Sequence, residues 1–371
     1  MRNKILFILH IPPPVNGAAM VGDFIQKSLI VNTTYDADYI NLTTSFALND
    51  IGKGGIGKLK ALLSIQNKVV KALLNKHYDL CYMTLTAKGA GFYKDFLVVL
   101  LLKLFRKKIV YHFHNKGVLE NSRKWYNRVL YKMAFYNTDS ILLAPNLYQD
   151  IERYVKKDRV HFCPNGIPDI QKKPTAPIVN MNGSGVCRIL FLSNMMEEKG
   201  VLELLRACQL LKIKGKTFEC HFIGAWSDIS ENRFKSLVRQ YDIHDLVYVH
   251  GKKYNDEKIP FFQNADIFVF PTYYHNECFP LVLLEAMQYQ LPIISTREGA
   301  ISEMVVDGIT GVLVQQKNTK ELAEQMEVLI DNPEVRRGMG SAGRQRYKSL
   351  YTLDVFENKL ISILKKVLNG E

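Results

Sequence analysis

The chain of 371 residues is long enough for two domains, and its composition of 47% hydrophobic and 23% charged residues is that of a globular protein. The longest apolar run, residues 96–102, falls far short of the ~20 residues that span a bilayer, so we expect no transmembrane helix. The apolar stretch near Met1 lacks the cleavage pattern of a secretory signal. The six cysteines show no metal-site spacing, which indicates reduced, buried thiols and no zinc site.

Positive charge is concentrated in the first half of the chain. Residues 1–170 carry a net charge of +12, whereas residues 171–371 carry only +1. A basic surface of this kind favours an anionic partner, such as phospholipid headgroups, a polyprenyl diphosphate or nucleic acid. A solvated surface that only aids solubility would have the same composition.

Short apolar strand patterns alternate with amphipathic helical patterns along the chain. The predicted strands are residues 4–11, 108–114, 140–144, 188–193, 218–223, 247–250, 267–271 and 291–295. The helical patterns include residues 20–30, 59–74, 125–136, 202–211, 321–330 and 353–368. This alternation predicts an α/β protein with parallel sheets that are covered by helices on both faces.

The loop after the first strand contains three prolines and then Gly17, and a helix follows. Ligands of open α/β sheets bind beyond the carboxyl ends of the strands. Glycine there lets the backbone approach an anion at the helix start, although a tight turn would equally need glycine. The loop is not G-x-G-x-x-G, which argues against a dinucleotide-dependent dehydrogenase.

A break in the pattern separates two halves. Residues 164–185 contain four prolines and a Gly-Ser-Gly run, and a hydrophobic strand starts afresh after them. We therefore predict an N-terminal domain of residues 1–170, a linker of residues 171–186 and a second domain of residues 187–350. The amphipathic helix of residues 352–369 is expected to pack back onto the first domain.

In the second half, the strand at residues 188–193 leads through a loop to Lys199, near the start of a helix. A cation is unusual there because it faces the positive end of the helix dipole. A bound phosphate would explain this choice. The alternative is a solvated lysine beside Glu197 and Glu198.

Glu277 and Glu285 follow the strand at residues 267–271 and are eight residues apart. On one helix they would lie about 12 Å apart and could not share a site. Pro280 lies between them and is favoured at the first helical position, which places Glu277 in the preceding loop. Both carboxylates could then flank a helix N-terminus whose free N–H groups suit a diphosphate, while the carboxylates accept sugar hydroxyls. Two surface glutamates are the alternative interpretation.

Together these segments resemble the family 4 glycosyltransferases of GT-B fold, the group 1 glycosyltransferases of bacterial polysaccharide synthesis. The resemblance covers nearly the whole chain and is densest over residues 188–314. It is carried by Lys199-Gly200, Phe222-Ile-Gly224, Val249-His-Gly251, the glutamate pair and residues 265–271, 291–296 and 299–311. It implies two Rossmann-like, doubly wound parallel-sheet domains that face a central cleft.

The resemblance also implies roles for individual residues. Glu277 would hold hydroxyls of the transferred sugar, Glu285 the ribose of the nucleotide and Lys199 its diphosphate. His114 best matches a histidine near the reacting sugar, with His112 as the second choice because both lie on one face of a strand. The rest of the implied donor site consists of Gly17, Asn194, Gly224, Gly251, Phe279, Pro280, Leu281 and Val282.

The sequence departs from the family pattern at two of these positions. Family members commonly carry arginine where Asn194 stands, so Lys199 and helix N-termini would have to stabilise the leaving diphosphate without that charge. Asn194 could still donate a neutral hydrogen bond. Pro280 replaces a common glycine and has no N–H to offer.

The resemblance implies a retaining transferase that moves a sugar from a UDP- or GDP-sugar to a saccharide or polyprenyl-diphosphate-linked acceptor. We expect a cytoplasmic protein, peripheral on the inner face of the plasma membrane, that binds no nucleic acid. No cofactor or metal is expected, because the D-x-D pattern of Asp36 and Asp38, a metal-binding motif in another glycosyltransferase fold, is far in sequence from the donor segment. The alternatives are a GT-B-shaped sugar-nucleotide epimerase and a non-catalytic sugar-nucleotide-binding subunit, which the loss of arginine at Asn194 would favour.

Overall fold

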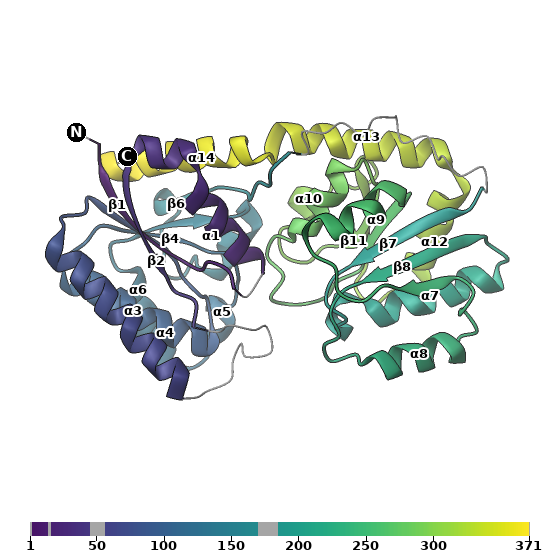
Figure 1. Ribbon diagram of the computed structural model, residues 1–371, viewed down its shortest axis with the longest axis horizontal. Coiled ribbons are helices and arrows are strands. Elements are labelled where there is room, and N and C mark those ends of the chain that lie inside the picture. The colour runs from purple at the N-terminus through teal and green to yellow at the C-terminus, as the bar shows by residue number, and fades with distance from the viewer. Residues whose placement is uncertain (1, 14–15, 45–55, 170–184, 371) are drawn as a thin grey trace. The chain divides into compact units, whose positions relative to one another are not determined.

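A computed structural model describes residues 2–13, 16–44, 56–169 and 185–370. The chain divides into two compact units, each described by itself below (Figure 1). Unit 1 comprises Met1–Gly166 and Leu353–Glu371, and unit 2 comprises Ile167–Thr352. The predicted linker of residues 171–186 lies outside the described residues except for its last two positions. Within the described residues, every helix is too short or too polar to cross a membrane.

Unit 1 contains a parallel sheet with the strand order β2-β1-β3-β4-β5-β6 within the described residues. The strands are β1 Lys4–Leu9, β2 Asp36–Asn41, β3 Leu80–Thr84, β4 Ile109–His112, β5 Asp139–Leu142 and β6 Val160–Phe162. The helices are α1 Gly17–Lys27, α2 Leu29–Thr34, α3 Ile56–Asn75, α4 Gly89–Leu104, α5 Val118–Asn121, α6 Trp125–Phe135 and α14 Leu353–Asn369, and Pro145–Asp150 and Lys157–Arg159 form 3-10 turns.

Unit 2 contains a second parallel sheet with the order β12-β11-β10-β7-β8-β9 in the part of the chain that the structure describes. The strands are β7 Cys187–Leu192, β8 Phe218–Ile223, β9 Val247–Val249, β10 Ile267–Phe270, β11 Ile293–Thr296 and β12 Gly311–Val314. The helices are α7 Val201–Ile213, α8 Glu231–Gln240, α9 Ile259–Asn264, α10 Leu281–Gln288, α11 Ile301–Met304, α12 Thr319–Asp331 and α13 Pro333–Leu350, with 3-10 turns at Glu197–Lys199 and Asn255–Lys258.

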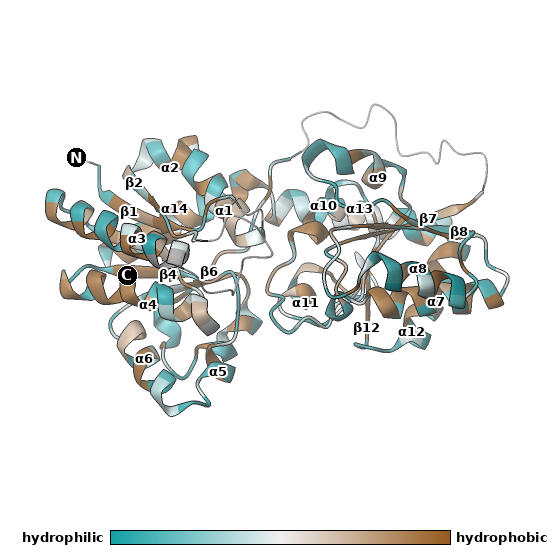
Figure 2. Cartoon of the chain, turned by 60° about the horizontal axis from the view of Figure 1, so that its bottom comes forward, coloured by the Kyte–Doolittle hydropathy of each residue, from teal (hydrophilic) through white to brown (hydrophobic). Residues whose placement is uncertain are grey.

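The strands form because short apolar runs become buried on both faces. All residues of β1 after Lys4 are fully buried, as are the side chains of β10 and β11. Figure 2 shows the strands in the hydrophobic colour between helices that carry hydrophilic residues on their outer sides. The predicted α/β class with parallel sheets is confirmed, and all six cysteines are buried.

The helix α14 lies with unit 1 although it follows unit 2 in the sequence. The Tyr35 hydroxyl donates to the Ile361 carbonyl at 3.2 Å, and the Cys163 thiol lies 3.9 Å from the Phe356 carbonyl. The ring of Phe356 stacks on that of His112 with a centroid distance of 6.4 Å. The last helix therefore covers part of the core of the first sheet.

Two local predictions need correction. The helical pattern at residues 20–30 is interrupted at Ser28, whose extended backbone ends α1 and whose Oγ accepts from the Val31 N–H at 3.2 Å to cap α2. No strand was predicted over residues 36–41, but Asp36 and Asp38 of the D-x-D pattern lie inside β2. The Lys76 ammonium donates to the Asp38 carboxylate at 2.8 Å, so this carboxylate already has a cationic partner.

Candidate functional site

The second sheet reverses its strand order beside its first strand. The chain builds β8 and β9 on one side of β7, and then returns to place β10, β11 and β12 on the other side. The loops after β7 and β10 leave this point at the carboxyl edge of the sheet, where doubly wound folds bind ligands. These two loops carry Lys199 and Glu277, so a pair of residues 78 positions apart meets at one edge.

The Lys199 ammonium donates to the Glu277 carboxylate and forms an ion pair with it. Both side chains are largely buried, with 13% and 12% of their surface exposed. The ammonium also lies 4.4 Å from the ring centre of Tyr274 and 5.5 Å from that of Phe270. Such contacts hold a cation in a partly desolvated place, where its field acts strongly on a neighbouring anion.

Gly200 makes this meeting of the two loops possible. Its φ of +83° is in the left-handed region, and a Cβ there would lie 2.3 Å from the Pro271 carbonyl oxygen. The loops are further joined by the Tyr273 N–H, which donates to the Glu198 carbonyl at 2.8 Å. Only glycine allows this close approach, which sets Lys199 two residues before the start of α7.

A second glycine positions Glu277 from the other side. Gly299 has a φ of +54°, and a Cβ there would lie 2.3 Å from the Glu277 carbonyl oxygen. The neighbouring Ala300 N–H donates to the Cys278 carbonyl at 2.8 Å. The segment between β11 and α11 therefore packs against the backbone of Glu277. The sequence pattern contained Gly299, but nothing in the sequence indicated this contact.

Glu285 forms an ion pair with a different lysine, Lys258. Its Oε1 accepts from the Lys258 ammonium at 2.5 Å, while its Oε2 is buried without a hydrogen-bond partner among the described residues. Lys258 ends a 3-10 turn before α9 and was not predicted from the sequence. The two carboxylates of the pair thus contact different lysines, and one buried oxygen of Glu285 accepts no hydrogen bond from the described residues.

The helix α10 begins one residue later than predicted. Pro280 is its N-cap, with φ of −69° and ψ of 111°, rather than its first helical residue. Glu285 is therefore the fifth residue of α10, and Glu277 lies before it in a loop. Leu281 and Val282 open the helix, so their N–H groups have no acceptor within it, while Phe279 is buried and packs on the Tyr351 ring at 5.8 Å.

The other predicted residues of unit 2 lie at the same edge of the sheet. Gly224 follows β8, and a Cβ there would lie 1.7 Å from the Ser193 carbonyl oxygen. Its N–H donates to the Gly251 carbonyl at 2.9 Å, which joins the loops after β8 and β9. Asn194 is exposed in the loop after β7, where its carbonyl accepts from the Met196 N–H at 2.8 Å.

The remaining predicted residues belong to unit 1. Gly17 is the first residue of α1, and a Cβ there would meet no described atom within 4 Å. The helix is capped by Asn16, whose Oδ1 accepts from the Ala19 N–H at 3.0 Å. Packing against the described residues therefore does not require glycine at this position. Its neighbours at residues 14 and 15 lie outside the described part.

His114 lies in a group of histidines at the carboxyl edge of the first sheet. Its ring is 4.2 Å from that of His112, as strand alternation predicts. Burial, and then the charge of His10, lower the pKa of His114 to about 3, and burial holds the pKa of His112 well below its usual range. Both rings are therefore neutral at pH 7. Among the described residues, the Nδ1 of His114 is buried without a partner.

His10 and Asp95 complete this group and were not predicted. Asp95 is fully buried, and its carboxylate lies 3.8 Å from the His10 Nε2 and accepts from the Thr86 N–H at 3.0 Å. Burial opposes ionisation, but Lys94 and His10 outweigh it and lower the pKa of Asp95 to about 2. An ionised Asp95 thus lies next to the ring of His10, the residue that directly follows β1.

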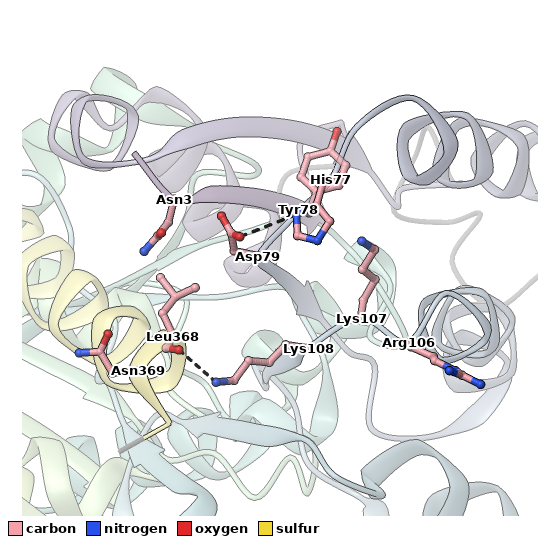
Figure 3. A pocket seen from close by; sticks show the side chains of 9 residues that line it. All are labelled: Asn3, His77, Tyr78, Asp79, Arg106, Lys107, Lys108, Leu368 and Asn369. Atoms are coloured by element: carbon pink, nitrogen blue, oxygen red, sulfur yellow. Dashed lines mark hydrogen bonds and ion pairs between the residues drawn. The ribbon is translucent and has the colours of Figure 1, made fainter. Parts of the chain in front are cut away.

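A hollow of about 450 Å³ lies at the opposite, amino edge of the first sheet (Figure 3). Within it the Lys108 ammonium donates to the Leu368 carbonyl at 3.3 Å. The hollow contains none of the predicted site residues. It is lined by Asn3, His77, Tyr78, Asp79, Arg106, Lys107, Lys108, Leu368 and Asn369.

Residues 183–346, which all fall in unit 2, match the sequence model of the family described as glycosyl transferases group 1. Unit 2 is a group 1 glycosyltransferase domain. The family recognised from Lys199, the glutamate pair and the segments around them is thereby confirmed.

Similar curated proteins match part of the chain. A D-inositol 3-phosphate glycosyltransferase of Arthrobacter sp. (strain FB24) is 32% identical over 161 residues, which are 43% of this chain and 38% of that protein. The capsular polysaccharide biosynthesis glycosyltransferase CapM of Staphylococcus aureus is 27% identical over 181 residues, which are 48% of this chain and 46% of that protein. These matches span less than half of either relative's own length.

The fold of the group 1 domain and of unit 1 is shared with solved structures. Anabaena Alr3699/HepE in complex with UDP and glucose has a TM-score of 0.71 and 17% identity, with 98% of this chain and all of that chain covered. The predicted GT-B class of fold is therefore confirmed. At this identity the likeness concerns the fold alone.

Proposed function

We propose that this group 1 glycosyltransferase moves a sugar, with retention of configuration, from a nucleotide-diphosphate sugar to a saccharide acceptor in cell-surface polysaccharide synthesis. The observation that carries the proposal is the Lys199–Glu277 ion pair at the strand-order reversal, beside the free amino end of α10. Anabaena HepE, which shares the fold, binds UDP and glucose. This supports a nucleotide diphosphate, with UDP or GDP proposed, as the carrier of the donor sugar.

The proposed donor pose follows from the chemistry of each group. The diphosphate would lie at the start of α10, where the N–H groups of Leu281 and Val282 and the Lys199 ammonium favour an anion. Glu277 would accept hydrogen bonds from the transferred sugar, and Glu285 from the ribose. The buried Oε2 of Glu285, which has no described partner, supports the ribose assignment.

Cleavage of the sugar–phosphate bond builds negative charge on the departing diphosphate. A fixed cation and oriented N–H groups stabilise such charge because they need no reorganisation during the reaction. Lys199 is suited to this because Glu277, Tyr274 and Phe270 fix its position. We assign to His114 a neutral hydrogen bond with the sugar, since its pKa of about 3 excludes a role as a cation at pH 7.

We further propose that transfer needs no divalent metal and no cofactor. Lys199 supplies a positive charge where a metal would otherwise act, and Asp38 is already engaged by Lys76. The acceptor is proposed to be lipid-linked and used at the inner face of the plasma membrane, so that the protein is cytoplasmic and peripheral. The net charge of +12 on residues 1–170 supports an anionic surface as partner.

The experiment is a thermal-shift screen with nucleotide diphosphates and their sugars, followed by nucleotide release with lipid-linked acceptors. A ligand that binds only the folded protein raises its melting temperature. We expect one donor to give a shift, and Glu277→Ala and Glu285→Ala to abolish transfer while the protein stays folded. Full activity in either variant would overturn the donor site.

The same assay separates the alternatives. Turnover of the sugar nucleotide without any acceptor would indicate an epimerase. A thermal shift without release for any donor and acceptor pair would indicate a non-catalytic binding subunit. Release that depends on both the donor and the acceptor is the result that the proposed function requires.

A further inference from the structure

Two helices of unit 1 leave large apolar side chains in solvent. On α4, Leu97 and Leu104 are 42% and 76% exposed. On α6 and its C-cap, the exposed apolar side chains include Trp125, Val129, Met133 and Tyr136. We call these six residues the α4–α6 face. Single exposed apolar residues are common, but a contiguous group of them marks an interaction surface.

The spacing of these residues puts each set on one side of its helix. Leu97 and Leu104 are seven residues apart, and the four positions on α6 follow one another at intervals of four, four and three. Residues at such intervals share one helical face. The opposite sides of the two helices carry the buried residues of the core, including Phe92 and Tyr131, whose ring centres are 4.4 Å apart.

The two helices lie side by side, so that their exposed stripes form one surface. Near the start of both, the Tyr93 hydroxyl donates to Asn127 Oδ1 at 2.8 Å. Near the end of both, the Lys103 ammonium donates to the Tyr136 carbonyl at 2.5 Å. The helices therefore run in the same direction and are tied together at both ends.

The charges around this face are almost all positive. Residues 93–136 contain ten lysines and arginines but only two acidic residues. Of the two, Asp95 is fully buried and Glu120 is ion-paired with Lys88 at 2.6 Å. Arg128 and Lys132 are exposed on α6 itself. Arg106, exposed at the edge of the hollow in Figure 3, comes two residues after Leu104.

An anionic bilayer surface fits this combination of groups. Aromatic and aliphatic side chains enter the boundary between headgroups and acyl chains, while lysine and arginine remain at the phosphates. A second copy of the chain fits less well, because the same excess of positive charge would then face itself. Charge complementarity therefore favours anionic lipid over self-association.

We propose that the α4–α6 face lies on an anionic phospholipid membrane, with the side chains of Leu104 and Trp125 in the interface. The inference rests on the proposed function for its purpose, since a lipid-linked acceptor is reached from such a surface. Its observations are separate, because they concern helices that carry none of the predicted donor residues.

The test is flotation of the purified full-length protein with vesicles of phosphatidylcholine alone or mixed with phosphatidylglycerol. We expect the wild-type protein to float with the mixed vesicles at low salt, and the double variant Leu104→Ser and Trp125→Ser to bind at least about tenfold more weakly. The matched control is Leu29→Ser with Ile213→Ser, which removes side chains that are 82% and 76% exposed elsewhere. This control should bind like the wild type.

A second pair of variants tests the charges. Arg128→Glu with Lys132→Glu should lower binding to the mixed vesicles by more than about tenfold, since each basic residue near an anionic surface contributes about fivefold. Lys359→Glu with Lys365→Glu on α14 gives the same net charge at exposed positions on another helix. That control should keep most of the binding.

Three results would overturn the inference. The first is that the wild-type protein does not float with the vesicles. The second is that the Leu104→Ser and Trp125→Ser variant floats as well as the wild type. The third is that the wild-type protein forms a dimer without lipid and that this variant is monomeric. Nucleotide-induced thermal shifts of the same variants keep the two proposals apart. A protein that floats but responds to no nucleotide would contradict the proposed function and leave the membrane surface standing.

Discussion

The ion pair of Lys199 and Glu277 is the residue-scale feature with the clearest functional meaning. Both side chains are nearly buried, and taking two charges from water costs about as much as their attraction returns. The pair therefore contributes little net stability to the domain. A substrate with a diphosphate and hydroxyl groups explains better why both charges are kept at the end of β7 and β10.

Replacing Lys199 with methionine should lower kcat of transfer by about 10²–10³-fold, the usual effect of losing one preorganised group that stabilises developing charge. Nucleotide release under saturating donor measures this. Lys214→Met is the control, because it removes another lysine of unit 2 whose ion pair, with Glu327 at 2.5 Å, lies away from the site. Equal losses in both variants would mean that Lys199 has no special part in transfer.

Asn194→Arg tests the departure from the family pattern. The side chain is exposed in the loop after β7, so an arginine can be accommodated there. A guanidinium at this place should form charge-assisted hydrogen bonds with the diphosphate and lower KM for the donor about tenfold. Initial rates over a range of donor concentrations give the answer. An unchanged KM would place Asn194 outside reach of the diphosphate.

At the scale of elements, the site depends on how closely loops approach one another. Gly200 and Gly299 both have left-handed backbones and both lie against the loop that contains Glu277, at its Pro271 end and at Glu277 itself. Side chains at either position would push the loop away. The two glycines therefore determine the position of the loop that carries the Glu277 carboxylate.

Gly299→Ala should both destabilise the domain, by about 1–3 kcal/mol, and reduce activity, because a Cβ would lie 2.3 Å from the Glu277 carbonyl oxygen. Urea unfolding and nucleotide release measure the two effects. The matched control is Gly338→Ala in α13, where a Cβ would meet no described atom within 4 Å. That change should stabilise the helix by about 0.5–1 kcal/mol and leave activity unchanged.

The histidines at the end of β4 predict a pH dependence of stability. His114, with a pKa of about 3, and His112, with a pKa well below 6.5, are neutral when folded but take up protons near pH 6.5 when unfolded. The free energy of unfolding should therefore be at its full value above pH 6.5. Below that it should fall by about 1.4 kcal/mol per pH unit for each histidine.

Urea unfolding at several values between pH 7 and pH 5 tests this dependence. His114→Asn should reduce the slope of the unfolding free energy against pH by about 1.4 kcal/mol per pH unit, because the unfolded variant takes up one proton fewer. His77→Asn is the control, since its side chain is 82% exposed. A slope that His114→Asn leaves unchanged would show that this ring is not held neutral by the fold.

Much of this arrangement could be predicted from the sequence, and the misses have physical causes. Long apolar runs such as β1 and β7 were found because parallel strands are buried on both faces. Four strands were missed: β2, whose sequence DADYIN is polar at the start, and β3, β6 and β12, whose three to five residues are too few to show a pattern. Sequence motifs indicated Lys199 and Glu277. Lys258 and His10 were missed because only tertiary contacts bring them to Glu285 and Asp95.

At the scale of the whole molecule, α14 completes unit 1 from the far end of the chain. The side chain of Phe356 is 1% exposed and packs on His112, and the Phe356 carbonyl accepts a hydrogen bond from the Cys163 thiol. Phe356→Ala should therefore lower the free energy of unfolding of unit 1 by about 3–5 kcal/mol and leave that of unit 2 unchanged. Amide hydrogen exchange should accelerate in the strands of unit 1 and not in those of unit 2.

The control for this prediction is Val335→Ala, which truncates a side chain that is 40% exposed on α13. It should leave exchange unchanged in both units. Faster exchange that spreads equally over β7 and β10 after Phe356→Ala would instead mean that the two units unfold together.

The return of α14 to unit 1 has a consequence for biosynthesis. Unit 2 is one continuous stretch, Ile167–Thr352, whereas unit 1 is made of the first and last stretches of the chain. On the ribosome, the stretch of unit 1 that is translated first must therefore wait for α14, which emerges only after unit 2, whereas unit 2 is translated without interruption. Folding would then proceed in the reverse of the usual order from amino to carboxyl terminus. During that interval, the nascent first sheet would lack the cover of α14 and would be the natural client for a chaperone.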